Sequence, residues 1–224
     1  MNNAEYKIYI DEVIRRVEHA RLQVSQHHIV KIVAVSKYSS THEIKELYQI
    51  GQRAFGENKV QDLRAKSLEL DELPLEWHFI GNLQKNKINN LLDSNPTLFQ
   101  ALDSLELAQE IQKKLEARNM ILDALLQINS AKEESKHGFM PEIAKEMYEQ
   151  IQNECPNINL KGVMSIGAYS EDKEIIKKSF QTTHAIYTQL KGATICSMGM
   201  SGDFELAIEC GSNMVRLGSI MFNK

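Results

Sequence analysis

Short runs of β-branched and apolar residues recur along the chain, and each is followed by a polar segment with apolar residues at helical spacing. Eight of these runs have the length and composition of buried strands. They are Lys31–Ser36, Arg53–Glu57, Trp77–Gly81, Thr97–Ala101, Asp123–Ile128, Leu160–Ile166, Ala193–Met198 and Met214–Gly218. A helix over about Ala4–Val24 precedes the first run. The pattern therefore predicts an opening helix and eight strand–helix units.

The expected helices carry start and stop signals. Ser40 to Glu43 has the spacing of a capping box, and Gly51 is expected to end that helix. Ser104 begins a helix with one apolar stripe, formed by Leu105, Ala108, Ile111 and Leu115. Asp203 is expected to cap a short helix over Phe204–Cys210.

Eight such units in 224 residues predict an α/β fold, a single (β/α)8 TIM barrel over residues 1–224 with an extra N-terminal helix. An open, doubly wound sheet is the alternative, because periodicity does not distinguish a closed parallel sheet from an open one. The four prolines are isolated, and no Gly/Ser-rich stretch indicates a linker. We therefore expect one domain and, in the absence of an obvious exposed apolar stripe, a monomer.

Composition narrows the class of protein. The net charge of −4 argues against a protein whose main function is to bind the nucleic-acid backbone. The N-terminus has no signal-peptide pattern, and no apolar stretch is long enough to span a membrane. Three cysteines without metal-ligand spacing are expected to be free thiols in a reducing compartment. Without a signal peptide or a membrane span, we expect a cytoplasmic protein. The pair His27-His28 has no further residues at metal-ligand spacing, so we expect no metal site.

Lys37 follows the first strand directly. Strand alternation puts Val33, Val35 and Lys37 on one face, so Lys37 points into the barrel mouth if the valines point inward. Catalytic groups of such barrels lie at this end. A desolvated lysine has a lowered pKa, and its neutral amine attacks aldehydes. A solvated lysine at a strand end is the plainer interpretation, and position alone favours it.

Arg216 lies in the last strand and shares a face with Met214 and Gly218. An inward arginine is costly unless it meets an acceptor. Two interpretations stay open: a structural ion pair with a carboxylate such as Glu57, or a contact with a ligand heteroatom or anion.

Two glycine-bearing turns follow the seventh and eighth strands. Gly199 and Ser201 lie in the first, and Gly218 and Ser219 form the second. Glycine lets backbone N–H groups approach a ligand, and serine hydroxyls can donate to an anion. Barrels often bind phosphate after strands seven and eight, so the two turns together predict a phosphate site. An imine-forming lysine, an arginine and a phosphate site together fit pyridoxal 5'-phosphate (PLP).

Other candidates carry less weight. His78 is more typical of a satisfied strand-end histidine than of an acid or base. Asn58 either contacts a ligand or, with Glu57, caps the next helix. Lys136, after the fifth strand, is a second amine near the mouth or simply a solvated loop lysine.

Five motifs occur in order along nearly the whole chain. They are Val33–Lys37, Phe55–Gln61, Trp77–Lys87, Ser197–Ser201 and Val215–Gly218. Together they resemble the pyridoxal phosphate homeostasis protein family. The resemblance implies a fold similar to the N-terminal barrel of alanine racemase, with a Schiff base on Lys37 and Arg216 facing the pyridine nitrogen. It also implies that Ser201, Gly218 and Ser219 hold the phosphate. From their positions in the motifs, we name Asn58, His78 and Gly199 as further cofactor-site candidates.

The resemblance also implies intracellular PLP homeostasis: members buffer or deliver the cofactor, with PLP-dependent apo-enzymes as recipients, and influence amino-acid and keto-acid balance. The alternative is a racemase-like enzyme, which needs proton-transfer groups on both faces of the cofactor. In two-domain racemases the second group comes from a β domain, whereas this sequence ends six residues after Gly218. We therefore expect a cofactor-binding protein without a defined reaction. The sequence departs from the family pattern at Ser219 and Asn213, where threonine is usual.

Overall fold

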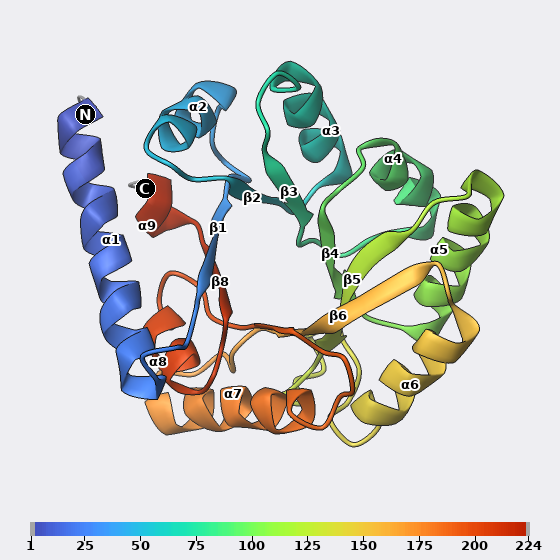
Figure 1. Ribbon diagram of the computed structural model, residues 1–224. Helices are drawn as coiled ribbons and strands as arrows, with labels where there is room; N and C mark the ends of the chain where they lie inside the picture. The colour runs from blue at the N-terminus through green and yellow to red at the C-terminus, as the bar shows by residue number, and fades with distance from the viewer. Residues whose placement is uncertain (1–2, 223–224) are drawn as a thin grey trace.

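The computed structural model describes residues 3–222. Within these residues, eight parallel strands form a closed barrel in chain order, and helices alternate with the strands around its outside (Figure 1). The strands are β1 Lys31–Val35, β2 Ala54–Glu57, β3 Glu76–Phe79, β4 Leu98–Leu102, β5 Leu122–Ile128, β6 Ile158–Ser165, β7 Ile195–Ser197 and β8 Met214–Leu217. The helices are α1 Asn3–Val24, α2 Thr41–Gln49, α3 Val60–Glu69, α4 Ile88–Asp93, α5 Leu105–Arg118, α6 Ala144–Glu154, α7 Lys173–Tyr187, α8 Phe204–Glu209 and α9 Ser219–Phe222, with a 3-10 turn η1 at Lys85–Lys87.

Pairing of the first strand with the last closes the barrel. Lys31 of β1 lies opposite Met214 of β8, and the register runs on to Ala34 and Leu217. The predicted (β/α)8 barrel is confirmed, and the open-sheet alternative is wrong. Closure leaves no unpaired sheet edge, which an open sheet would have to protect.

All eight predicted strands form, with shifted ends. β6 begins at Ile158, earlier than predicted, because it pairs with the full length of β5, starting opposite Leu122. β7 is shorter than predicted, since the Ala193 N–H closes a turn onto Leu190 O instead of entering the sheet.

Helix starts follow the sequence with one exception. Ser40 and Glu43 form the predicted capping box of α2, and Ser104 caps α5. Asp203 occupies the N-cap position of α8, but its carboxylate accepts the Met200 N–H at 2.6 Å and does not cap the helix. The expected role is therefore wrong: Asp203 closes the turn in front of α8.

The ends of the described chain meet. α9 lies beside α1 (Figure 1), and the Tyr6 hydroxyl of α1 donates to Met221 O at 2.7 Å. Arg16 of α1 forms two hydrogen bonds with Glu205 of α8, at 2.7 and 2.9 Å. The opening helix is thus tied to the last unit of the barrel.

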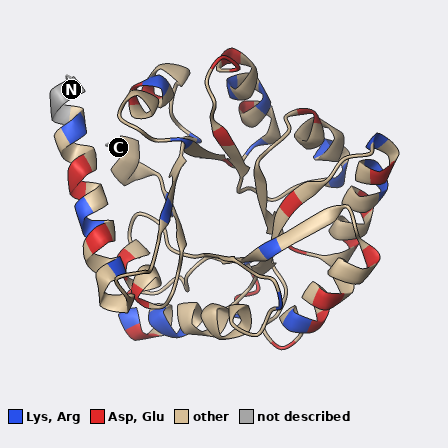
Figure 2. Ribbon diagram, in the orientation of Figure 1, with Lys and Arg blue, Asp and Glu red and all other residues tan. Residues whose placement is uncertain are grey.

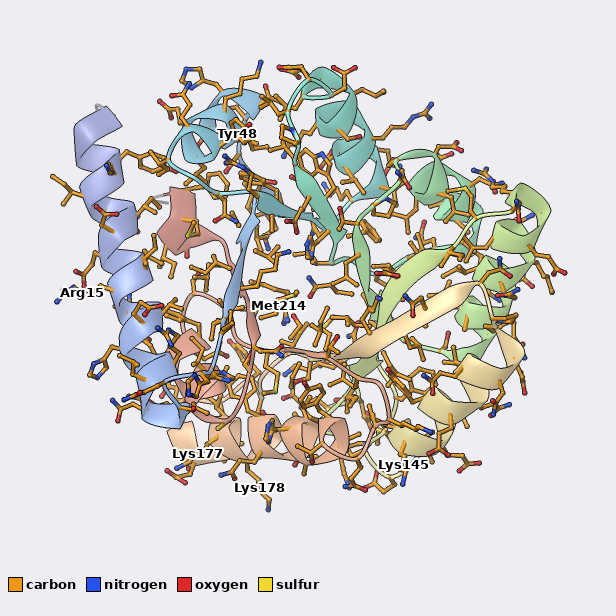
Figure 3. The ribbon with its side chains drawn as sticks, in the orientation of Figure 1. Arg15, Tyr48, Lys145, Lys177, Lys178 and Met214 are labelled. Carbon is orange, nitrogen blue, oxygen red and sulfur yellow. The ribbon has the colours of Figure 1, made fainter. Side chains whose placement is uncertain are left out.

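Charge and polarity separate the layers. Figure 2 shows Lys, Arg, Asp and Glu mostly on the surrounding helices and loops. Met214, labelled in Figure 3, lies inside the ring of strands and is buried.

No helix in residues 3–222 combines the length and hydropathy that crossing a bilayer requires. The same residues contain no cluster of three or more His, Cys, Asp or Glu side chains arranged to hold a metal ion.

Candidate functional site

A cavity of about 320 Å³ opens at the carboxyl ends of β1 and β8. The residues that line it come from four parts of the chain: Val35, Lys37, Tyr38, Ser39, Ile80, Met200, Ser201, Arg216, Gly218, Ser219 and Phe222. Five of the sequence-predicted site residues therefore meet here, namely Lys37, Ser201, Arg216, Gly218 and Ser219.

Lys37 reaches the cavity as strand alternation predicts, since Val35 lines the same wall. Its side chain is exposed, and Nζ lies 5.0 Å from the centre of the Tyr38 ring. Of the two interpretations of Lys37, the structure therefore shows the solvated amine at the strand end, and not a desolvated one. The amine faces an open mouth, where an incoming ligand can reach it.

A buried ion pair holds the backbone that precedes Lys37. The Ser36 hydroxyl donates to Glu57 Oε1 at 2.6 Å. Lys66 Nζ of α3 donates to the same oxygen at 2.6 Å and to Ser36 O at 2.7 Å. Glu57 is fully buried, and its Oε2 has no hydrogen-bond partner among the described residues. This network fixes the end of β1 against β2 and α3.

Arg216 is 4 % exposed and lies on the inner face of β8. Nη1 donates to Ser197 O at 2.9 Å and to Ser197 Oγ at 2.7 Å, and Nη2 donates to Ser165 O at 2.8 Å. The suggested ion pair with Glu57 is wrong, because the partners of Glu57 are Ser36 and Lys66.

The guanidinium of Arg216 therefore donates its hydrogen bonds to uncharged acceptors. Burial lowers the pKa of its guanidinium to about 10, although the more distant Asp203 opposes this shift, so the group stays cationic at neutral pH. Nε forms no hydrogen bond within residues 3–222, and it is not completely buried. Since Arg216 lines the cavity, Nε–H is available to a ligand there.

The turns after β7 and β8 are joined. The Gly218 N–H donates to Ser201 Oγ at 3.1 Å, and Ser219 opens α9. Gly199 has φ +93°, and an added Cβ would lie 2.7 Å from Ala207 Cβ. Gly199 therefore lets the turn pack on α8, while its carbonyl accepts the Arg216 N–H at 3.0 Å. It supports the cavity from behind and does not line it.

Asn58 and His78 lie outside this cavity. Asn58 is half-buried between β2 and α3, and it does not cap α3, because Lys59 occupies the N-cap position. His78 is 1 % exposed inside the barrel and borders a different cavity, which Lys31 and Asp123 line at the amino ends of the strands. The structure does not bring these two side chains to Lys37.

Lys136 lines a smaller neighbouring cavity of about 190 Å³. Its Nζ donates to Glu133 Oε1 at 2.9 Å and to Gly167 O at 2.7 Å. The solvated-loop interpretation is wrong, because the amine is held by these two acceptors. Asn213 lies at the opposite end of the barrel from Lys37, where its amide bridges Cys196 N and Thr194 O.

Sequence reasoning missed several lining residues. Tyr38 and Ser39 follow Lys37 directly, and Ile80 belongs to the third-strand motif, so adjacency could have indicated them. Gly56 packs beneath Val33 and Ile80: an added Cβ would lie 3.2 Å from Val33 Cγ1 and 3.4 Å from Ile80 Cδ1. Met200 lies in the same turn as Ser201; it is 41 % exposed and lines the cavity.

The cavity presents a reachable amine, a buried arginine without a carboxylate partner, and the hydroxyl groups of Ser201 and Ser219. A ligand with a carbonyl carbon, a basic ring nitrogen and a phosphate matches these three features. The uncompensated charge of Arg216 is the strongest sign of a fit, because a buried cation favours an acceptor opposite it.

The chain is similar to known proteins over nearly its whole length. The family model described as the alanine racemase N-terminal domain matches residues 8–224. A pyridoxal phosphate homeostasis protein of Helicobacter pylori is 54 % identical over 220 residues, which are 98 % of this chain and 99 % of that protein. The human protein of the same name is 38 % identical over 210 residues, which are 87 % of this chain and 76 % of that protein.

Solved structures agree on the fold. PipY of Synechococcus elongatus with PLP bound superposes with a TM-score of 0.79 at 29 % identity, covering 92 % of this chain and 99 % of that one. An alanine racemase of Clostridium difficile has a TM-score of 0.70 at 19 % identity, covering 92 % of this chain and 55 % of that one. The second likeness concerns the fold alone.

Proposed function

The chain belongs to the pyridoxal phosphate homeostasis protein family, and from this premise we propose that it binds PLP as a Schiff base on Lys37. The function is cytoplasmic PLP homeostasis, in which the protein holds the cofactor and delivers it to apo-enzymes. The observation that carries the proposal is the convergence of Lys37, Arg216, Ser201, Gly218 and Ser219 on one cavity. PLP bound to the related PipY supports the choice of ligand.

Each group has a distinct task. PLP supplies an aldehyde that condenses with a lysine amine and a ring that can withdraw electrons. Lys37 provides that amine from a backbone fixed by Glu57 and Lys66. Arg216 would offer Nε–H to the ring nitrogen of bound PLP. Because a guanidinium does not give up its proton near neutral pH, it would leave that nitrogen unprotonated and weaken electron withdrawal by the ring.

The turns after β7 and β8 would hold the phosphate. Ser201 and Ser219 provide hydroxyl donors, and both serines line the cavity. Serine at position 219 keeps the hydroxyl that the threonine usual in the family would offer, so the departure leaves phosphate binding intact.

Borohydride reduction followed by peptide mass mapping tests this proposal. The purified protein is expected to absorb in the visible range, and reduction should fix the cofactor on the peptide that contains Lys37. Lys37→Ala should lose both signals. Lys136→Ala is the matched control, because it removes an amine of the neighbouring cavity and should keep both. A label on Lys136 in the wild type, or no label at all, refutes the proposal.

The racemase-like alternative predicts proton exchange at the α-carbon of amino acids. Incubating PLP-loaded protein with a panel of amino acids in deuterium oxide separates the two functions. A homeostasis protein exchanges slowly with all of them, whereas sustained rapid exchange with one amino acid establishes an enzyme. The proposed monomeric state is tested by sedimentation with and without PLP.

A further inference from the structure

A row of polar side chains crosses the interior of the barrel from the cavity that contains Lys37. It begins at Arg216, whose Nη1 donates to Ser197 Oγ at 2.7 Å. Ser197 Oγ donates to Gln100 Oε1 at 2.7 Å, and Gln100 Nε2 lies 2.8 Å from His78 Nδ1. All four side chains are buried, and they come from the separate strands β8, β7, β4 and β3.

Donor and acceptor rules give this row one direction. Arg216 has only donors, so Ser197 Oγ accepts from it, and the Ser197 hydroxyl then donates to Gln100 Oε1, which faces it at 2.7 Å. The carbonyl of Gln100 is then occupied, and its amino group must meet His78. Gln100 Nε2 also contacts Met214 Sδ at 3.4 Å, a weak acceptor that suits the same orientation.

His78 anchors the far end. Because the Gln100 amino group faces Nδ1 and has only donors, we assign Nδ1 as the acceptor and place the imidazole proton of His78 on Nε2. Burial lowers the pKa of His78, which keeps the ring neutral and Nδ1 free to accept. Nε2 has no hydrogen-bond partner among the described residues; the nearest carboxylate oxygen, Glu76 Oε2, is 4.0 Å away, too far for a hydrogen bond.

From this arrangement we infer that Ser197, Gln100 and His78 are positioning residues for Arg216. They hold the guanidinium plane so that Nε–H faces the cofactor ring, and the inference rests on the proposed function. None of the three lines the Lys37 cavity, so each acts through the arginine.

The physical need for such support follows from burial. Arg216 has no carboxylate partner within hydrogen-bond distance, and its charge depends on three acceptor contacts with Ser197 and Ser165. Without Gln100, the Ser197 hydroxyl proton loses its acceptor, and the lone pair that faces Arg216 is no longer fixed. The guanidinium is then held firmly only by two backbone carbonyls, Ser197 O at Nη1 and Ser165 O at Nη2, and its plane is less well fixed.

The test uses full-length protein and PLP itself. Gln100→Leu keeps a side chain of similar size but removes the groups that connect Ser197 to His78. Ser197→Ala, which removes the hydroxyl, is a second variant for the case in which the first folds poorly. Both are expected to bind PLP about tenfold more weakly, as the loss of one charge-assisted contact predicts. Gln100→Glu keeps an acceptor for Ser197 and should bind PLP within about twofold of the wild type.

Gln52→Leu is the matched control. Gln52 donates to two backbone carbonyls, those of Ile32 at 2.9 Å and Ala54 at 2.6 Å, without touching Arg216. It should lower the melting temperature and leave PLP affinity unchanged. If Gln100→Leu and Ser197→Ala bind PLP as the wild type does, the inference is overturned while the proposed function stands. If the wild type itself binds no PLP, the proposed function fails and the inference falls with it.

A readout on the protein without cofactor tests the network directly. Nitrogen-15 shifts of His78 should show a protonated Nε2 and a bare Nδ1 in the wild type. Gln100→Glu should move the proton to Nδ1, since a carboxylate cannot donate. A wild-type His78 protonated on Nδ1 would contradict the donor direction and overturn the inference, whatever the PLP affinity.

Discussion

The buried ion pair beside Lys37 offers a direct test of how the end of β1 is held. Lys66→Met removes the ammonium group and keeps a side chain of similar length. In the variant, Glu57 would keep one hydrogen bond, from the Ser36 hydroxyl, and its Oε2 already has no partner in residues 3–222. The side chains of Lys66 and Glu57 are 14 % and 0 % exposed, so water cannot replace the missing partner without local opening.

Breaking a buried pair from one side costs about 3–5 kcal/mol, because the remaining charge stays desolvated. For a chain of this size each kcal/mol lowers the melting temperature by roughly 2–4 °C. We therefore expect Lys66→Met to melt about 10 °C below the wild type. The double variant Glu57→Gln with Lys66→Met removes both charges and should recover at least half of the loss.

Thermal unfolding monitored by circular dichroism measures these differences, with urea unfolding as a check. Lys113→Met is the control, because Lys113 pairs with Glu110 on the exposed face of α5 and its removal should leave the melting temperature unchanged. The reasoning is refuted if Lys66→Met melts within about 2 °C of the wild type, or if the double variant is no more stable than the single one.

Two further predictions concern a glycine and an acid. Gly199→Ala should lower the free energy of unfolding by about 2–3 kcal/mol, because φ is +93° and the new Cβ would lie 2.7 Å from Ala207 Cβ. Gly192→Ala, at φ +81° with open space around it, should lower it by only about 1 kcal/mol. Equal urea midpoints for the two variants would contradict this prediction. The His78 imidazole, 4.0 Å away, and then the Lys31 ammonium, which forms an ion pair with Glu76, lower the pKa of Glu76 to about 2. Because the folded pKa is below the unfolded value of about 4.3, this stabilisation is present above that value and is lost as the pH falls towards 2. Glu76→Gln should flatten that part of the stability profile, and an unchanged acid limb would show that Glu76 contributes nothing.

The local pattern of the chain determined a large part of the fold. Strand runs and caps such as Ser40 and Ser104 depend on neighbours within a few residues, so the sequence alone predicts them. Alternation along β1 and β8 likewise placed Lys37 and Arg216 on inward faces, and ordered motifs supplied their expected ligand. Strand ends were less predictable: β6 begins where its neighbour β5 begins, and a turn closed onto Leu190 O delays the start of β7.

Only the tertiary structure decided which side chains meet. Closure of β1 on β8 brings Arg216 near Lys37, 179 positions away along the chain, and periodicity carries no information about closure. Glu57 and His78 show the same limit. Each belongs to a motif near the expected site, yet Glu57 pairs with Lys66 outside the cavity and His78 faces the opposite end of the barrel. A buried polar group must find its hydrogen-bond partner within the protein, because water does not reach it. Which groups are buried, and which partners are close enough, is decided only when the strands and helices pack.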